Sequence, residues 1–212
     1  MRIIRIIINV CIPIFLLMLF ASILTTKPYL MLSKGLYHSH ERIDFDHEYA
    51  VDRIIGYLNY QYDDLNFGSN EDDNEVIMRD IEISHMVDVK NLYTTLRIVA
   101  ISAGAVALGL CIFLYYRNKN QLYRTIKTLP IGPIFFTMFL GGYFIIDFRT
   151  AFNTFHEMFF TNDDWLLRST DVLILLLPLN FWLVSASIIL VLFASTLGLM
   201  YWINEKTLGK NA

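Results

Sequence analysis

Four long apolar segments, separated by polar ones, run along the chain. A helix needs about 20 predominantly apolar residues to cross the hydrocarbon core of a bilayer, and the pattern predicts transmembrane helices at 1–24, 97–116, 130–147 and 181–203. The last apolar run already begins at Val172, but Pro178 would break a helix inside it. We therefore expect residues 172–177 to lie in the membrane interface, with the fourth span after them.

This pattern predicts an all-α integral membrane protein. Between the spans we expect a small extracytoplasmic helical domain at 25–96, a basic cytoplasmic loop at 117–129, and an extracytoplasmic aromatic loop with the interfacial segment at 148–180. A cytoplasmic tail at 204–212 would follow the last span. Within the first of these, the sequence favours a helix near 45–62 and a second helix that begins near Met78 and continues into the second span.

The distribution of basic residues predicts the orientation, because short cytoplasmic loops are rich in Lys and Arg. The basic residues that flank the spans fall in three segments, which we place inside: Arg2, Arg5, Arg117, Lys119, Arg124, Lys127, Lys206 and Lys210. The two remaining segments are acidic and would lie outside, so a nucleic-acid partner is not expected. The first apolar run is too long for a signal peptide and lacks a small-residue cleavage site, which indicates a retained anchor.

Composition supports a membrane protein, with 55% hydrophobic and 15% aromatic residues. Cys11 and Cys111 both fall within expected spans, where a disulfide framework is not expected. The sequence contains no G-x-S-x-G elbow, H-E-x-x-H motif or phosphate-binding glycine loop. Candidate chemistry is thus limited to the histidines, all of which the topology places outside.

Three histidines follow the first span, together with two carboxylates that could complete a metal site: His38, His40, His47, Asp44 and Asp46. An H-x-H pair directs both rings to the same side only on a strand, whereas this region is expected to be a loop that leads into a helix. Surface residues near the lipid headgroups are therefore the favoured interpretation, and no metal site is predicted.

His85 lies in the stretch EISHMVDVKNLY, between Glu82 and Asp88. On a helix, side chains three residues apart are neighbours, so both carboxylates would flank the imidazole. A carboxylate that holds one ring nitrogen raises the basicity of the other, which suits a general base. An ordinary surface helix with salt bridges is the alternative, and spacing alone favours it.

His156 lies in the stretch FHEMFFTNDDW, which combines an imidazole and three carboxylates with four aromatic rings. Such rings suit the membrane interface, and partial desolvation favours the neutral form of an imidazole. A histidine of the aromatic belt, hydrogen-bonded to a backbone carbonyl, is the alternative.

Four stretches taken together resemble the bacterial lipoprotein intramolecular transacylase family. They are YLNYQYDDLNFG at 57–68, EISHMVDVKNLY at 82–93, FHEMFFTNDDW at 155–165 and LLLPLNFW at 175–182. The resemblance covers most of the chain in order. The sequence departs from the family pattern at Tyr60, where a small residue is expected, and in the acidic loop after His156.

The resemblance implies a four-span enzyme that moves the sn-2 acyl chain of an S-diacylglyceryl cysteine onto the α-amine of that cysteine. It implies a diacylglyceryl-modified lipoprotein as substrate, in contact with membrane lipid, and His85 and His156 as the catalytic pair. No cofactor or nucleotide is expected, because conversion of an ester to an amide is downhill. We expect His85 to be the base and His156 the acid or polarising group, or the reverse.

Supporting roles are predicted for four more side chains. Asn59 or Asn162 could donate a hydrogen bond to the oxyanion, and Arg97 or Arg149 could meet a lipid phosphate or main-chain carbonyls of the substrate. Two other functions stay open: an extracytoplasmic lipid or lipoprotein ester hydrolase that uses the same histidines, and an accessory membrane protein without enzymatic activity. Lost acyl chains would indicate the hydrolase, and tolerance of histidine substitution the accessory protein.

Overall fold

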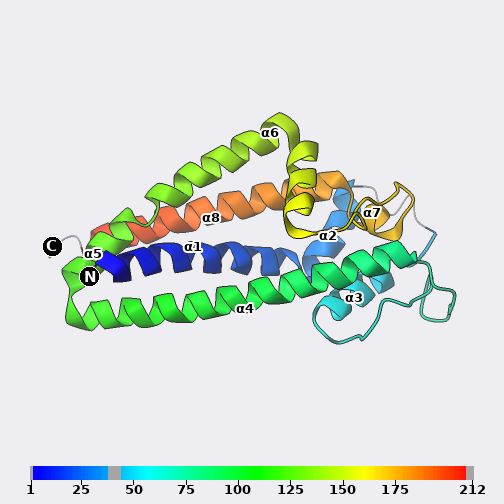
Figure 1. The fold of residues 1–212 in the computed structure, drawn as a ribbon, viewed down its shortest axis with the longest axis horizontal. Coiled ribbons are helices and arrows are strands. Elements are labelled where there is room, and N and C mark those ends of the chain that lie inside the picture. Colours follow the sequence, from blue (N-terminus) through cyan, green and yellow to red (C-terminus); the bar gives the residue numbers. More distant parts are fainter. Residues whose placement is uncertain (1, 38–43, 209–212) are drawn as a thin grey trace. The chain divides into compact units, whose positions relative to one another are not determined.

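The computed structural model describes residues 2–37 and 44–208, and in this part of the chain the regular elements are helices without any β-strand. Four helical segments are long and apolar enough to cross a membrane, at Arg2–Leu24, Asp80–Arg117, Lys119–Phe159 and Leu179–Thr207. Figure 1 shows them as the long helices of the molecule. The expected fold class, an all-α protein with four candidate spans, is therefore confirmed.

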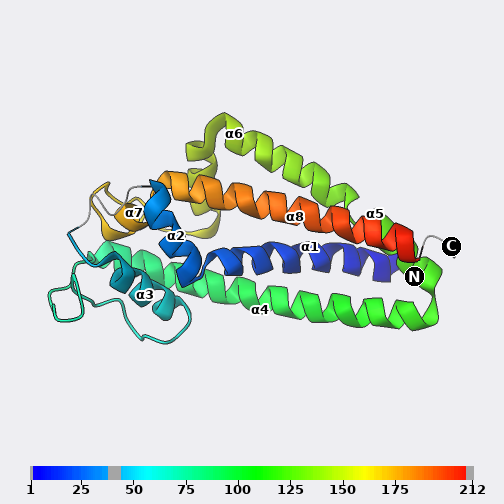
Figure 2. The same ribbon diagram turned by 180° about the vertical axis from the view of Figure 1, so that it is seen from behind.

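Two compact units make up the chain. The first comprises residues 1–21, 96–146 and 186–212, and the second residues 22–95 and 147–185. In the first unit, α1 (Arg2–Leu24) packs on α8 (Leu179–Thr207) through Leu16, Phe193 and Leu197. Ile8 of α1 also packs on Leu114 of α4, and Figure 2 shows α1 beside both helices.

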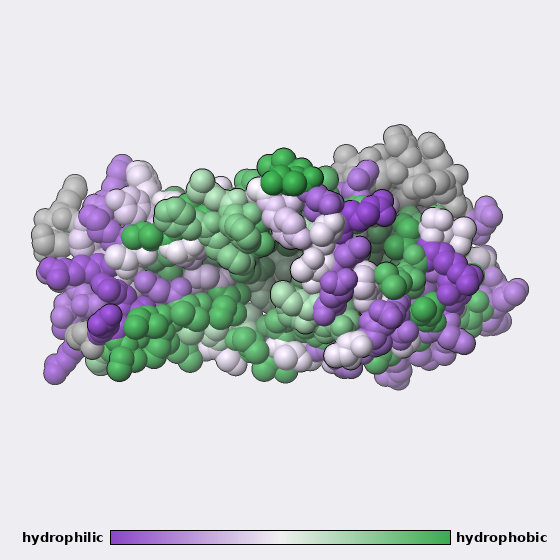
Figure 3. Space-filling model, turned by 45° about the horizontal axis from the view of Figure 1, so that its top comes forward, coloured by the Kyte–Doolittle hydropathy of each residue, from purple (hydrophilic) through white to green (hydrophobic). Residues whose placement is uncertain are grey.

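Large apolar side chains remain exposed on these long helices. Ile101 on α4, and Phe139 and Ile145 on α6, are 65%, 72% and 87% exposed. Figure 3 shows many such hydrophobic residues on the molecular surface. Helices whose apolar residues face outward are surrounded by lipid rather than water, so the chain is a multi-pass membrane protein.

The second unit has its own core between short helices. These are α2 (Lys27–Tyr37), α3 (His47–Leu58) and α7 (Val172–Leu176), and they pack with the first turns of α4 (Asp80–Arg117). Each of the four helices contributes buried apolar side chains to this core, for example Leu30 from α2, Val51 from α3, Met86 from α4 and Leu176 from α7. Helix α2 was not expected from the sequence, and neither was α5 (Lys119–Thr128), which occupies the basic loop. Helix α3 lies within the range where a helix was expected.

Helix α6 (Ile131–Phe159) contains a break at Asp147, where φ is −155° and ψ is 86°. The Asp147 carboxylate accepts hydrogen bonds from both the backbone N–H and the hydroxyl of Thr150, at 3.1 and 2.6 Å. This is the arrangement of a helix N-cap, so a second helical segment begins here. Residues 148–159 are consequently helical, whereas the sequence suggested an aromatic loop.

Helices α7 and α8 are separate, as the proline predicted. Helix α7 ends at Leu176, Pro178 stands in the gap, and α8 begins at Leu179. Helix α4, by contrast, is continuous over 38 residues, a length of about 57 Å at the rise of an α-helix. This is nearly twice the thickness of the hydrocarbon core, so its polar first turns extend beyond the expected span at 97–116.

Candidate active site

Two buried histidines of the second unit lie side by side. His85 comes from the first turns of α4 and His156 from the segment of α6 after Asp147, and both are outside the expected spans. Their ring centroids are 5.8 Å apart, with the ring planes inclined by 36°. Each residue is only 8% exposed. Two imidazoles from distant parts of the sequence therefore share one buried site.

The tautomer of His156 is set by its own helix. Nδ1 lies 2.8 Å from the carbonyl oxygen of Phe152, and because a carbonyl only accepts, the Nδ1–H donates. Nε2 then carries the lone pair. The rings of Phe152, Phe160 and Trp165 lie 4.2, 5.6 and 5.0 Å from the imidazole between centroids. Burial lowers the pKa of His156, against a smaller opposing effect of the Phe152 carbonyl.

His85 is also buried, but its Nδ1 lacks the hydrogen bond that Nδ1 of His156 makes. Its Nδ1 has no hydrogen-bond partner among the described residues, and Phe160 packs edge-on against the ring at 5.1 Å. Burial, and then the neighbouring His156, lower the pKa of His85 to about 4. The charges of Asp88 and Asp164 oppose this shift without cancelling it. At neutral pH both imidazoles are thus uncharged and able to accept or donate a proton.

Glu82 is fully buried but does not hydrogen-bond to His85. Its carboxylate oxygens accept from the backbone N–H groups of Leu173, at 2.9 Å, and Arg79, at 3.0 Å. Burial raises the pKa of Glu82, although these two hydrogen bonds oppose the shift. The side chain therefore joins the start of α4 to the start of α7.

Asp88 does not hydrogen-bond to His85 either. Its Oδ2 accepts from Asn162 Nδ2 at 2.8 Å. This contact is one of several side-chain hydrogen bonds between the start of α4 and the segment that follows His156. Ser84 donates to Asp164 at 2.6 Å, and Arg79 Nη1 donates to both oxygens of Asp171, at 2.8 and 2.9 Å.

Arg79 and Asp171 were not anticipated from the sequence. Asp171 is buried and also accepts from the backbone N–H of Arg168 at 2.7 Å. No local pattern marked this pair, since its members are far apart along the chain. Through their hydrogen bonds, Arg79, Ser84 and Asp88 of α4, the helix that carries His85, hold the segment that follows His156 in place.

The other predicted residues lie in various environments. Asn59 caps α3, where its side chain donates to the carbonyl of Ile55 at 3.0 Å. Arg149 is exposed just after the break in α6, and Arg97 belongs to the first unit. Asn162 contacts a residue beside the histidine pair, because its side chain donates to Asp88.

The early histidines do not form a described metal site. His38 and His40 lie outside the described residues, whereas His47 is the first residue of α3 and is buried rather than on the surface as expected. Asp46 caps this helix by accepting from the backbone N–H of Glu48 and Tyr49. Within residues 2–37 and 44–208, no group of three or more His, Cys, Asp or Glu side chains could hold a metal ion.

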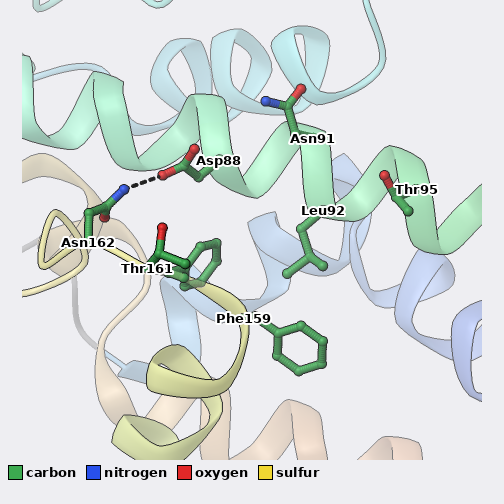
Figure 4. A pocket seen from close by; sticks show the side chains of 8 residues that line it. Asp88, Asn91, Leu92, Thr95, Phe159, Thr161 and Asn162 are labelled. Carbon is green, nitrogen blue, oxygen red and sulfur yellow. Dashed lines mark hydrogen bonds between the residues drawn. The ribbon is translucent and has the colours of Figure 1, made fainter.

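A pocket of about 290 Å³ adjoins the histidine pair. Figure 4 shows one wall on α4 and the other on the turn after α6. It is lined by Asp88, Asn91, Leu92, Thr95, Phe159, Phe160, Thr161 and Asn162. Phe160 is shared, since its ring also packs against both imidazoles. The site thus combines two neutral bases with an adjacent cavity that has both polar and apolar lining residues.

Comparison with known proteins gives one family. The family model of the lipoprotein intramolecular transacylase Lit matches residues 4–182. No curated protein matches the chain.

Solved structures of the membrane-integral transacylase Lit from Bacillus cereus are similar in fold. One has a TM-score of 0.82 at 22% sequence identity, covering 99% of this chain and 96% of that one. Two structures of that protein with a histidine substitution, to arginine or to alanine, each have a TM-score of 0.77 at 22% identity. They cover 99% of this chain and 92% or 94% of theirs.

Proposed function

Because the chain belongs to the lipoprotein intramolecular transacylase family, we propose that His85 and His156 are the catalytic pair of this membrane enzyme. Its reaction is intramolecular acyl transfer on a lipoprotein substrate. The observation that carries the assignment of the site is the 5.8 Å separation of two buried imidazoles. Histidines on opposite faces would have contradicted this assignment.

The transfer moves the sn-2 acyl chain of an S-diacylglyceryl cysteine to the α-amine of the same cysteine. A bond forms between the amine nitrogen and the carbonyl carbon, the bond from that carbon to the glycerol oxygen breaks, and one proton passes from nitrogen to oxygen. The transition state closes a ring of about eight members, so holding the two reacting groups in attack geometry supplies much of the catalysis.

We assign His156 as the base. Its Nδ1–H is engaged by the Phe152 carbonyl, which leaves Nε2 to take the proton of the attacking amine and return it to the glycerol oxygen. His85 is the polarising group, because a neutral imidazole with a lowered pKa can donate an N–H to the carbonyl oxygen. This is the reverse of the order that the sequence favoured.

The site lies on the extracytoplasmic side in this proposal, as the basic flanks of the spans indicate. A lipid-modified cysteine at the membrane surface could then reach it with its acyl chains still in the bilayer. Asn162 is the candidate oxyanion donor, since its side chain lies next to Asp88 in the turn after α6. Arg97 and Arg149 remain candidates for contacts with lipid phosphate.

The test is mass spectrometry of the N-terminal lipopeptide from a reporter lipoprotein, made in cells without other N-acylation activity, with and without this protein. Unchanged mass with one acyl chain on nitrogen is the expected product. Loss of an acyl chain without N-acylation would indicate the ester hydrolase. An unaltered diacylglyceryl peptide, despite good expression, would indicate the accessory protein and overturn the proposal.

A further inference from the structure

The pocket beside the histidine pair has a distinctive charge. Among its lining residues, Asp88 is the only one with a charged side chain, and the others contribute amides, hydroxyls and apolar groups. A cavity with one carboxylate and no cation disfavours fatty acids and lipid phosphates and favours a cationic ligand with hydrogen-bond donors. This composition suits a primary ammonium.

The Asp88 carboxylate is held in place with one oxygen unused. Oδ2 accepts from Asn162 Nδ2 at 2.8 Å, as the dashed line in Figure 4 marks. Oδ1 has no hydrogen bond to any residue that the structure describes. The hydroxyls of Thr95 and Thr161 line the same cavity. An ammonium with three N–H donors would find a fixed anionic acceptor and neutral acceptors around it.

The pocket is also next to the reacting groups. Asp88 follows His85 by one helical turn on α4, and its charge acts on the ring of His85. Phe160 lines the pocket and contacts both imidazoles. A group bound at Asp88 is therefore a near neighbour of the catalytic pair.

We propose that this pocket binds the free α-amino group of the diacylglyceryl cysteine as an ammonium, with Asp88 as the specificity-determining residue. The inference rests on the proposed function. The ammonium is the form that binds; one proton then leaves to solvent, and the neutral amine attacks the ester carbonyl. Acylation converts the amine to an uncharged amide, so the product loses its partner at Asp88 and its release is favoured.

The experiment measures binding without turnover. An S-dialkylglyceryl cysteinyl peptide has ether links in place of esters and cannot react, and it is prepared with a free or an N-acetylated α-amine. In detergent micelles, wild-type protein should bind the free amine about tenfold or more tightly than the acetylated form, as expected for a charge-assisted hydrogen bond. Asp88→Asn preserves an acceptor for Asn162 and should abolish this preference.

Asp163→Asn is the matched control. Asp163 is an exposed acid in the same turn as Asn162 but does not line the pocket, so its variant should retain the preference. With the ester substrate, Asp88→Asn should raise KM about tenfold without lowering kcat, which a distorted active site would not do.

Equal binding of the two peptides by wild type, or an unchanged preference in Asp88→Asn, would overturn the inference. Either result alongside normal acyl transfer leaves the proposed function intact. Absence of transfer alongside a clear amine preference would refute the function alone.

Discussion

The Nδ1 atom of His156 lies 2.8 Å from the carbonyl oxygen of Phe152, one helical turn earlier on α6. The proton of the imidazole is thereby fixed on the nitrogen that faces its own backbone. The other nitrogen, which we propose as the base, has no carboxylate partner among the residues that the structure describes. In the proposed site, a main-chain carbonyl thus takes the orienting role that a carboxylate often has in histidine catalysis.

Removal of either imidazole should stop the reaction. His156→Ala removes the proposed base, and His85→Ala removes the proposed polarising N–H. Each substitution should therefore lower kcat by a factor of about 10² to 10⁴ with unchanged expression. Lipopeptide mass spectrometry measures the product. Glu157→Ala changes an exposed neighbour of His156 and should be active. Near-normal turnover in either histidine variant would exclude the pair.

The pH dependence should reveal one titrating group rather than two. Because the pKa of His85 is lowered to about 4 and that of His156 is lowered below its ordinary value near 6.5, both imidazoles are neutral at pH 7. Only the substrate amine, with a pKa of about 7.7 to 8.0, then titrates. A plot of log kcat/KM against pH should have a slope of one below about pH 7, without a second break at the ordinary imidazole value near 6.5. A slope of two that begins near pH 6.5 would contradict buried, neutral histidines.

Asp171→Ala should destabilise the second unit. It removes both hydrogen bonds from Arg79 and that from the backbone of Arg168. The free energy of unfolding should fall by about 2 to 3 kcal/mol. This is less than for a fully buried ion pair, because Arg79 is partly exposed. Thermal unfolding in detergent measures it. Arg168→Ala is the control, since its exposed side chain makes no ion pair with a residue that the structure describes, and its backbone hydrogen bond to Asp171 stays. Equal melting temperatures for the two variants would refute this role of Asp171.

Tyr60 departs from the family pattern at a position where the backbone explains the expected small residue. Its φ is +61°, and it follows the C-cap of α3. The N–H of Gln61 bonds to the Gly56 carbonyl and that of Tyr60 to the Tyr57 carbonyl, which defines a Schellman motif with tyrosine where glycine is usual. Two side-chain contacts compensate for the strain of this positive φ. The Lys90 Nζ lies 4.2 Å from the centre of the Tyr60 ring, and the Tyr60 hydroxyl lies 2.9 Å from the Thr94 hydroxyl.

Substitutions at Tyr60 should separate these two effects. Tyr60→Gly relieves the backbone strain but loses the contacts, so stability should change by less than about 1 kcal/mol. Tyr60→Val loses the contacts and keeps the strain with a β-branched side chain, and should lower the free energy of unfolding by about 2 kcal/mol. Chemical denaturation of both variants tests the difference. Equal stability would show that the positive φ is not the controlling factor.

The sequence could predict the spans because membrane helices are specified by local composition. The break at Pro178 also followed from local chemistry. The helix at 148–159 was missed because its aromatic residues suited an interfacial loop equally well, and its N-cap at Asp147 coincided with the end of an apolar run. The neighbours of Glu82 could not be predicted either, since the carboxylate binds the backbone of distant Leu173. The histidine pair was accessible only through the family resemblance, because neither motif specifies its partner.

The exposed apolar side chains of the long helices, such as Ile101 and Phe139, also determine how the reaction rate must be expressed. They confine the enzyme to a bilayer in which the lipid-anchored substrate is confined as well, so the two meet by lateral diffusion in two dimensions. The initial rate then follows the mole fraction of lipopeptide among the lipids. Added inert lipid slows the reaction in a fused membrane, whereas added buffer leaves it unchanged.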